Sequence, residues 1–405
     1  MRSKGSVIIR NVMLLESVHI ERVKLKDLPA LAETVIKAAA PGSFIPITKH
    51  RAAAHTYNPN ASPVDVALLL AKAGERNVGY FGLMPVMLRH EGELHKVYWL
   101  TTWAVAPEYL GRGLGSQLME AALALDVDLA IVGSKPARRV SSKYGFSEAK
   151  SLEYVQIDLG LAGRYNPISL ILHLMRKALS LFDVRINIER LDLALGRFFD
   201  LIFAPVLRPL LTNWLMRRVG RPARSASMQR VQQVQAVSES PADGPGFYRS
   251  LEVINWMLAH PWVLPSGLSE SEHLDYSFTD ARPGFELSGW QVSAANGEQL
   301  GFICFQTSLI DGRRVVKVLD HQFPPSAPGD LLLELALQHA RRVRADLIEG
   351  SSELAAPLGS GVPARLLVRR RQRVCQVHPR TADSPLARAR HQLEQTYCDG
   401  DMAFT

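Results

Sequence analysis

Cysteine is scarce in this chain, which has three cysteines in 405 residues. Cys304, Cys375 and Cys398 are too few and too scattered for a disulfide framework or a cysteine-based metal site, and this fits a reducing compartment. Residues 1–21 also lack the apolar core and small-residue cleavage site of a secretion signal. We therefore expect a cytoplasmic protein without a metal site.

Long apolar runs and an excess of acidic residues are also missing. No stretch reaches the roughly 18 uninterrupted apolar residues of a membrane span. A content of 47% hydrophobic and 21% charged residues is typical of a soluble globular protein. The 47 Lys and Arg outnumber the 39 Asp and Glu, and the net charge of +8 suits anionic ligands, a membrane surface or nucleic acid. The length predicts two or three domains.

Strands and helices are both expected in the first part of the chain, which predicts an α/β unit of ordinary domain size. The expected elements are a strand at 17–24, a helix from about Asp27, antiparallel strands at 77–105 that turn near Gly92, a helix at 113–125, a strand at 129–133, a helix closed by Gly145 and a last strand at 153–159.

The second part of the chain repeats this plan after a connector. Residues 166–218 are apolar at helical spacing with Arg and Lys interspersed, and residues 221–246 have the composition of an exposed linker. Farther on, an apolar strand pattern, a loop, a helix and a strand follow one another again. Val97 and Asp128 lie 31 positions apart, as do Val315 and Asp346, since 128 − 97 = 346 − 315 = 31. This match predicts a duplicated domain.

Three glycines at alternate positions, Gly111, Gly113 and Gly115, stand just before the helix at 113–125. Glycine serves where φ is positive or where a ligand approaches the backbone, and a helix start favours an anion, so a phosphate-binding loop is the first interpretation. The Gly-Lys-Ser/Thr of a P-loop is absent, because Ser116 and Gln117 follow Gly115. A dinucleotide fingerprint also fits poorly, since its third glycine is Ser116.

The stretch "VAPEYLGRGLGSQLMEAAL", followed about 20 residues later by "KYGF", resembles the GNAT superfamily of acyl-CoA-dependent N-acyltransferases. The resemblance covers residues 17 to about 160. The position that the family pattern fills with Arg or Gln is Leu110, a departure from it. The matching positions are Val105, Pro107, Glu108, Gly113 and Gly115.

The resemblance implies an α/β (α+β) fold with two GNAT-like lobes, each a mixed central sheet flanked by helices, joined by a helical connector. The domains that it implies are a GNAT N-acyltransferase domain at 17–162, a helical connector and linker at 163–243, and a degenerate GNAT-like domain at 244–405.

It also implies that acetyl-CoA or another acyl-CoA is the co-substrate. Main-chain N–H groups from Leu110 to Ser116 would hold the CoA pyrophosphate. The acyl carbonyl would lie near the N–H of Val105. The implied binding residues are Val105, Leu110, Gly111, Arg112, Gly113, Leu114, Gly115 and Ser116.

The general acid is less defined. Many GNAT members carry a tyrosine four residues before the Gly-Phe pair, where this chain has Ser141, and the nearest tyrosine is Tyr144. Either hydroxyl is a candidate to protonate the leaving thiolate. The alternative for Tyr144 is a packing residue beside the helix end.

The loop of the second copy, "PPSAPGD", predicts no phosphate binding. Pro324 and Pro325 have no N–H, and Asp330 places negative charge at the helix start. We expect a degenerate lobe that stabilises the first lobe or shapes the acceptor site. With one intact signature and one lost, this chain resembles the tandem GNAT proteins associated with bacterial surface-polysaccharide assembly.

The resulting hypothesis is an N-acyltransferase, in particular an N-acetyltransferase, that acts on a small-molecule amine such as an amino sugar. A non-catalytic GNAT-like scaffold is the alternative, and an aminoacyl transferase that uses charged tRNA is less favoured because the CoA loop is present. The basic connector is expected to be an interdomain platform, with peripheral contact to the inner face of the membrane as the other interpretation. No motif for nucleic-acid binding is found.

Overall fold

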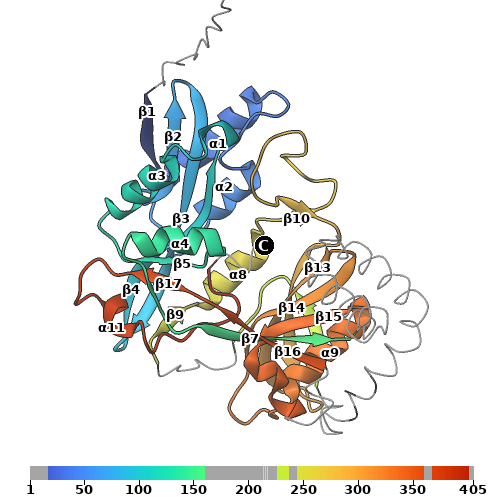
Figure 1. Ribbon diagram of the computed structural model, residues 1–405. Helices are drawn as coiled ribbons and strands as arrows, with labels where there is room; N and C mark the ends of the chain where they lie inside the picture. Colours follow the sequence, from blue (N-terminus) through green and yellow to red (C-terminus); the bar gives the residue numbers. More distant parts are fainter. Residues whose placement is uncertain are drawn as a thin grey trace, which may run out of the picture.

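Two large β-sheets with helices against them, together with a two-stranded sheet of β10 and β11, make up the described part of the chain (Figure 1). The first sheet has the order β1-β2-β3-β4-β5-β17-β6, and the second has the order β16-β7-β15-β14-β13-β12-β8. Both sheets are mixed, because β4 and β5 are parallel, as are β14 and β15, among antiparallel neighbours. The predicted α/β class with two sheet-bearing lobes is confirmed. The computed structural model describes residues 17–159, 226–236, 244–359 and 367–400, with the single residues 213, 215 and 217.

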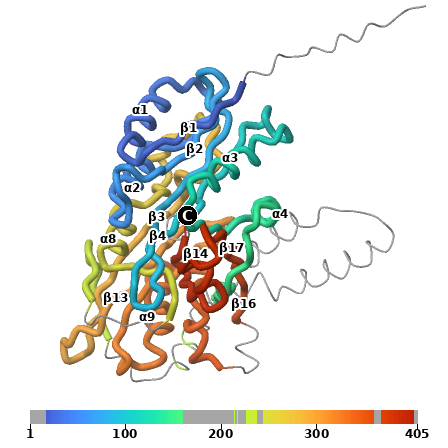
Figure 2. The backbone as a smooth tube through the Cα atoms, turned by 90° about the vertical axis from the view of Figure 1, so that its left-hand side faces the viewer, coloured from blue at the N-terminus to red at the C-terminus, as the bar shows by residue number. Residues whose placement is uncertain are grey.

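Helices cover both faces of the first sheet, as Figure 2 shows. Leu68 and Leu70 of β2 belong to the core formed with α1 and α2, whereas Leu69 and Ala71 belong to the core formed with α3. Consecutive strand residues point to opposite faces, so α1 and α2 lie on one face and α3 on the other. The elements of this first lobe are β1 (Val18–Lys24), α1 (Leu28–Ala38), α2 (Lys49–Thr56), β2 (Val66–Ala73), β3 (Arg76–His90), β4 (Glu93–Val105), α3 (Leu114–Leu123), β5 (Leu129–Ile131), α4 (Lys135–Lys143) and β6 (Ser147–Glu148).

A β-bulge in β4 separates this strand from β5. Phe81 pairs with Trp103 and Leu83 with Leu100, so two steps along β3 correspond to three along β4. The bulge lies opposite Gly82, where a Cβ atom would stand 2.5 Å from the Thr101 hydroxyl oxygen. Bulges increase twist and bend the strand that carries them. Accordingly, β4 pairs with β5 only from Tyr98 to Leu100. From there to Val105 it remains paired with β3 but has no partner strand on its other edge.

The second sheet has the same plan, including a bulge. Cys304 pairs with Asp320 and Phe305 with Val318, which leaves one extra residue in β14, and β14 then runs on past its three-residue pairing with β15. The elements of this second lobe are β8 (Ser227–Val231), α8 (Leu251–Ala259), β12 (Glu286–Ser293), β13 (Gln299–Ile310), β14 (Arg313–Gln322), α9 (Leu331–Val343), β15 (Leu347–Ser351) and β16 (Val368–Arg373).

The two lobes exchange one strand each. β7 (Leu152–Asp158) follows the first lobe in sequence but lies between β15 and β16 of the second sheet. β17 (Gln376–His378), near the C-terminus, lies between β5 and β6 of the first sheet. In Figure 1 the green β7 stands among orange strands and the red β17 reaches the first sheet. Neither sheet is therefore made by a continuous stretch of chain.

Two sequence expectations need correction here. The strand expected at 153–159 forms, but it joins the second sheet, because the exchange places it there. The stretch 221–246 was expected to be an exposed linker, yet Ser227–Val231 forms the edge strand β8. Most of the helical connector at 163–243 lies outside the described residues. The sheets are not divided at the predicted boundary of residue 162.

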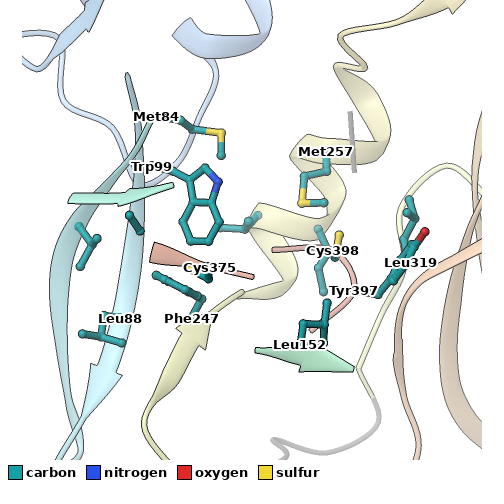
Figure 3. Packing of buried hydrophobic residues seen from close by; sticks show 14 of the residues in the cluster. Met84, Leu88, Trp99, Leu152, Phe247, Met257, Leu319, Cys375, Tyr397 and Cys398 are labelled. Carbon is teal, nitrogen blue, oxygen red and sulfur yellow. The ribbon is translucent and has the colours of Figure 1, made fainter. Parts of the chain in front are cut away.

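A shared hydrophobic core fixes the lobes to each other (Figure 3). Trp99 of β4 contacts Phe247 edge to face, with ring centroids 4.7 Å apart. Phe247 belongs to β9 (Gly246–Tyr248), which pairs with β3. Next to it, Arg249 donates hydrogen bonds to Asp320 of β14, at 2.6 Å, and to Asp399. The C-terminal turn, α11 (Pro385–Ala389) and β14 are thus packed together with β3 and β4.

We predict that residues 1–162 do not fold alone, because this fragment lacks β17 and leaves β7 without a sheet. Expressed alone, it should be insoluble or melt without cooperativity. Co-expressed with residues 226–405, it should co-purify as a cooperatively melting pair. A monomeric 1–162 fragment with a sharp thermal transition would contradict the role given to the exchange.

Candidate functional site

The loop from β4 to α3 is held by its own backbone. After Val105, the N–H of Ala106 donates to the carbonyl of Val78 at 2.9 Å, and a 3-10 turn at Pro107–Tyr109 follows. Gly111 and Gly113 then take φ values of 75° and 80°, in the left-handed region that favours glycine. These two glycines are thus required by the path of the chain.

The third glycine, Gly115, lies against an aromatic side chain. A Cβ atom at Gly115 would stand 3.4 Å from the indole of Trp103. Trp103 in turn stacks on Phe81 of β3, with ring centroids 4.9 Å apart. A side chain at position 115 would thus make an ordinary van der Waals contact, and packing does not require glycine there.

The N-terminus of α3 presents free donors on this loop. The first helical hydrogen bond runs from the N–H of Gln117 to the carbonyl of Gly113, so the N–H groups of Leu114, Gly115 and Ser116 have no partner within the helix. Gly113 occupies the N-cap position and has no side chain to accept them. Such a helix start, with the dipole behind it, attracts anions.

The structure brings the eight predicted CoA-binding residues together around this turn. Leu110 is exposed, and Arg112 lies over the ring of Tyr109 at 5.4 Å. Leu114 is buried in the core, so only its backbone faces the loop. Leu110, where the chain differs from the family pattern, thus has an exposed side chain outside the core.

The open edge of β4 begins where its pairing with β5 ends. β5 stops at Ile131, opposite Leu100, while β4 runs on from Thr101 to Val105. The two strands therefore separate beyond Leu100. The free edge leads directly to the glycine loop.

Ser141 and Tyr144 lie apart from this loop, on and just after α4. Ser141 is fully buried, and its hydroxyl donates to Gln376 of β17 at 2.7 Å. The hydroxyl of Tyr144 donates to Glu120 of α3 at 3.0 Å. Both hydroxyls thus have structural partners, and their catalytic role stays a prediction.

The equivalent loop of the second lobe has a different chemistry. It contains Pro324 and Pro325, and the N–H of Leu331 is already bonded to the carbonyl of Pro328 at 3.0 Å. Asp330 occupies the N-cap of α9, and Glu334 is buried in its first turn. Burial raises the pKa of Glu334 to about 7, and the charge of Asp330 adds to this shift. The charge of Asp330 at this helix start therefore opposes the binding of a phosphate.

Sequence reasoning missed two parts of the site. The bulge at Thr101 has no motif, although its partner Gly82 interrupts an apolar strand and could have signalled it. Arg51, Tyr80 and Tyr276 meet beside the end of β4 from three separate segments. No local pattern could have indicated that cluster.

Comparison with known proteins agrees with this geometry. Residues 40–140 match the profile of the acetyltransferase (GNAT) family. A search of curated proteins gives no match. Among the described residues, no helix has the length and apolar character to cross a membrane.

Solved structures with a similar course include a GCN5-related N-acetyltransferase from Anabaena variabilis, with 10% identity, 92% of this chain and 75% of that chain covered and a TM-score of 0.48. A probable N-acyltransferase from Enterococcus faecalis gives 10% identity, coverage of 91% and 74% and a TM-score of 0.48. A GCN5-related N-acetyltransferase from Kribbella flavida has 13% identity, with 90% of this chain and 71% of that chain covered and a TM-score of 0.41. These likenesses are too distant to assign an activity or a substrate.

We predict that Tyr144→Phe leaves turnover of an acyl-CoA within a few-fold of wild type. The substitution removes a hydroxyl that is bonded to Glu120 on the protein surface. Steady-state kinetics with acetyl-CoA checks this. A general acid contributes about 100-fold or more, so a loss of that size would make Tyr144 the acid.

A second prediction concerns Glu334. Its pKa is raised to about 7 in the folded chain, so between pH 4.5 and 7 the unfolded chain ionises while the folded one keeps the proton. The free energy of unfolding therefore falls as pH rises through this window, and Glu334→Gln should remove that fall.

Urea unfolding at pH 5 and pH 8 measures the effect. Glu334→Gln should gain stability over wild type at pH 8 relative to pH 5. The matched control is Glu252→Gln, an exposed glutamate in the first turn of α8. Equal behaviour of the two variants would show that Glu334 ionises freely.

Proposed function

We propose that the first lobe is an acyl-CoA-dependent N-acyltransferase, and specifically an N-acetyltransferase. The observation that carries this proposal is the uncapped start of α3, reached directly from the open edge of β4, within residues that match the GNAT family. A helix start with free N–H groups suits a diphosphate, and an unpaired strand edge suits an amide-bearing arm such as pantetheine.

The proposed arrangement assigns a function to each part of the site. The N–H groups of Leu114, Gly115 and Ser116 bind the pyrophosphate, and the free edge from Thr101 to Val105 pairs with the pantetheine amides. The acyl carbonyl then lies near the N–H of Val105, which stabilises negative charge on its oxygen. No metal is needed for this chemistry.

In the proposed reaction the amine attacks the thioester carbonyl. A bond forms between the amine nitrogen and the carbonyl carbon, and the carbon–sulfur bond breaks as the oxygen charge collapses. The amine proton passes to a base or water, and the thiolate takes a proton from an acid or water. Ser141 and Tyr144 remain the candidate acids, although each is held by a protein partner.

The acceptor belongs on the face of the first sheet that carries α1 and α2, because α3 covers the other face. A segment of the second half closes this side: β10 (Leu264–Pro265) and β11 (Ala281–Arg282) bracket a loop that bonds to residues 42–50. The N–H of Gly42 donates to the carbonyl of His273 at 2.7 Å. We therefore propose that the second half shapes the acceptor site, with an amino sugar of a surface-polysaccharide precursor as one acceptor.

We also propose a cytoplasmic location. The connector in residues 163–243, rich in basic and apolar side chains, is the part that would touch the inner face of a membrane. Most of its side chains lie outside the described residues, so the sequence pattern supports this contact.

The decisive test is Gly113→Glu with acetyl-CoA and CoA. The new side chain adds bulk and a negative charge where the diphosphate is proposed to bind. Losing two charge-assisted hydrogen bonds, about 1.5–3 kcal/mol each, predicts at least about a 100-fold loss of CoA affinity by calorimetry.

A matched control separates this effect from backbone strain. Gly297 has a φ of 84°, close to that of Gly113, in the exposed turn between β12 and β13. Gly297→Glu should melt earlier to a similar extent yet bind CoA like wild type. Equal CoA affinity in wild type and Gly113→Glu would refute the loop assignment, and CoA binding without thiol release for any amine would favour a scaffold.

A further inference from the structure

A buried arginine without a carboxylate partner lies on α2. Arg51 is 3% exposed, and no described carboxylate lies within ion-pair distance of it. Its Nη1 donates to the hydroxyl of Tyr276 at 3.0 Å, and its guanidinium lies over the ring of Trp262 at 3.9 Å. Nη2 has no hydrogen-bond partner among the described residues. An unpaired buried charge is costly, so a group of opposite charge would be bound strongly there.

Aromatic rings surround this guanidinium. Tyr80 is fully buried, and its ring centroid lies 5.4 Å from that of Phe44, 6.2 Å from that of Phe278 and 6.5 Å from that of Tyr276. The other three rings are only half-buried. The guanidinium of Arg51 is thus buried, whereas the rings of Phe44, Tyr276 and Phe278 near it are half-exposed. These three rings are called the aromatic rim.

A second polar group without a partner lies one helical turn away. Thr48 is the N-cap of α2 and is fully buried, but its hydroxyl has no hydrogen-bond partner among the described residues. The usual capping role is taken by Glu270, whose carboxylate accepts the N–H groups of Lys49 at 2.5 Å and His50 at 3.3 Å. The Thr48 hydroxyl is therefore free to donate to a ligand.

The surrounding groups leave one positive charge uncompensated. Burial, with a further contribution from Arg51, lowers the pKa of His55 to about 3, so this ring is neutral. Glu270 is engaged by His50 and by the start of α2. A single guanidinium balances a carboxylate, whereas a phosphate dianion would leave a net negative charge in the same buried place.

The cluster lies beside the proposed reaction site. Tyr80 of β3 pairs with Ala104 of β4, one residue before Val105, and both belong to the core on the α1 and α2 face. A ligand held there reaches the open edge of β4 from the face opposite α3. This is the direction left for an acceptor when CoA enters along the loop of α3.

We propose that a cluster of side chains around Arg51 binds a carboxylate carried by the acceptor. This Arg51 cluster consists of Arg51, Thr48 and the rings of Tyr80, Trp262, Tyr276 and Phe278. The substrate class is then an amine that bears a carboxylate and an apolar or ring-shaped body. Because Nη2 of Arg51 has no solvent contact, the carboxylate enters by displacing a half-buried ring of the rim. The inference rests on the proposed N-acyltransferase function.

Matched acceptor pairs test this specificity in the full chain with acetyl-CoA. The pairs are L-phenylalanine with L-phenylalaninamide and muramic acid with glucosamine, and glucosamine 6-phosphate provides a phosphate in place of the carboxylate. The carboxylate member should show a KM lower by about tenfold or more. Arg51→Met should remove that difference and leave the KM for acetyl-CoA unchanged. The matched control is Arg342→Met, an exposed arginine over the ring of Trp290 at 4.9 Å, which should keep the preference.

Direct binding separates this inference from the proposed function. Calorimetry with phenylacetate needs no turnover, and binding should be present in wild type and lost in Arg51→Met. If Arg51→Met does not fold, Tyr276→Phe removes only the hydroxyl that bonds Arg51 and should weaken phenylacetate about threefold or more.

Phenylacetate binding through Arg51 without acylation of any amine would support the carboxylate site and contradict the proposed N-acyltransferase function. Acylation with equal KM for both members of each pair, a preference for the phosphate, or a preference that survives in Arg51→Met would overturn the carboxylate site. Unchanged phenylacetate affinity in Tyr276→Phe would also count against it.

Discussion

The exchange of β7 and β17 is the constraint on which the rest of the structure depends. Without β17, the three-residue strand β5 would be a short edge of the first sheet, with nothing between it and β6. The amide of Gln376 on β17 also bonds to Ser141 and Ser142 and so fixes α4. The strand β17 therefore completes the sheet that carries the candidate site, and each sheet contains a strand from the other part of the chain.

The two lobes share a backbone plan and differ in the chemistry at one turn. Both have a bulge in the strand before the loop, and in both this strand leaves its parallel neighbour after three pairs. Glycines leave the helix start of the first lobe open to an anion. In the second lobe the carbonyl of Pro328 accepts the N–H of Leu331, and Asp330 supplies negative charge at the helix start. The shared backbone course gives each lobe an unpaired strand edge followed by a helix start. The residues of the loop then determine whether this helix start suits an anion.

The first sheet divides the proposed site between its two faces. On the α3 face, backbone donors suit a diphosphate whatever the neighbouring side chains are, and Leu110 on this loop is exposed. On the α2 face, Glu270 from the second half caps α2 and leaves Thr48 without its usual capping bond. The second half thereby contributes to the acceptor side of the proposed site without a CoA loop of its own.

The sequence by itself determined the local elements, because each is encoded by neighbouring residues. Alternation predicted β1, Asp27 marked the start of α1, and Gly92 marked the turn between β3 and β4. The glycine loop was also predictable, since positive φ values at Gly111 and Gly113 require glycine. Only the tertiary structure decided which sheet β7 and β17 join, because a buried strand has the same pattern in either sheet. It alone brought Arg51 to Tyr276, which are separated by 225 residues, because such contacts are set by packing between lobes and leave no periodic signal in the chain.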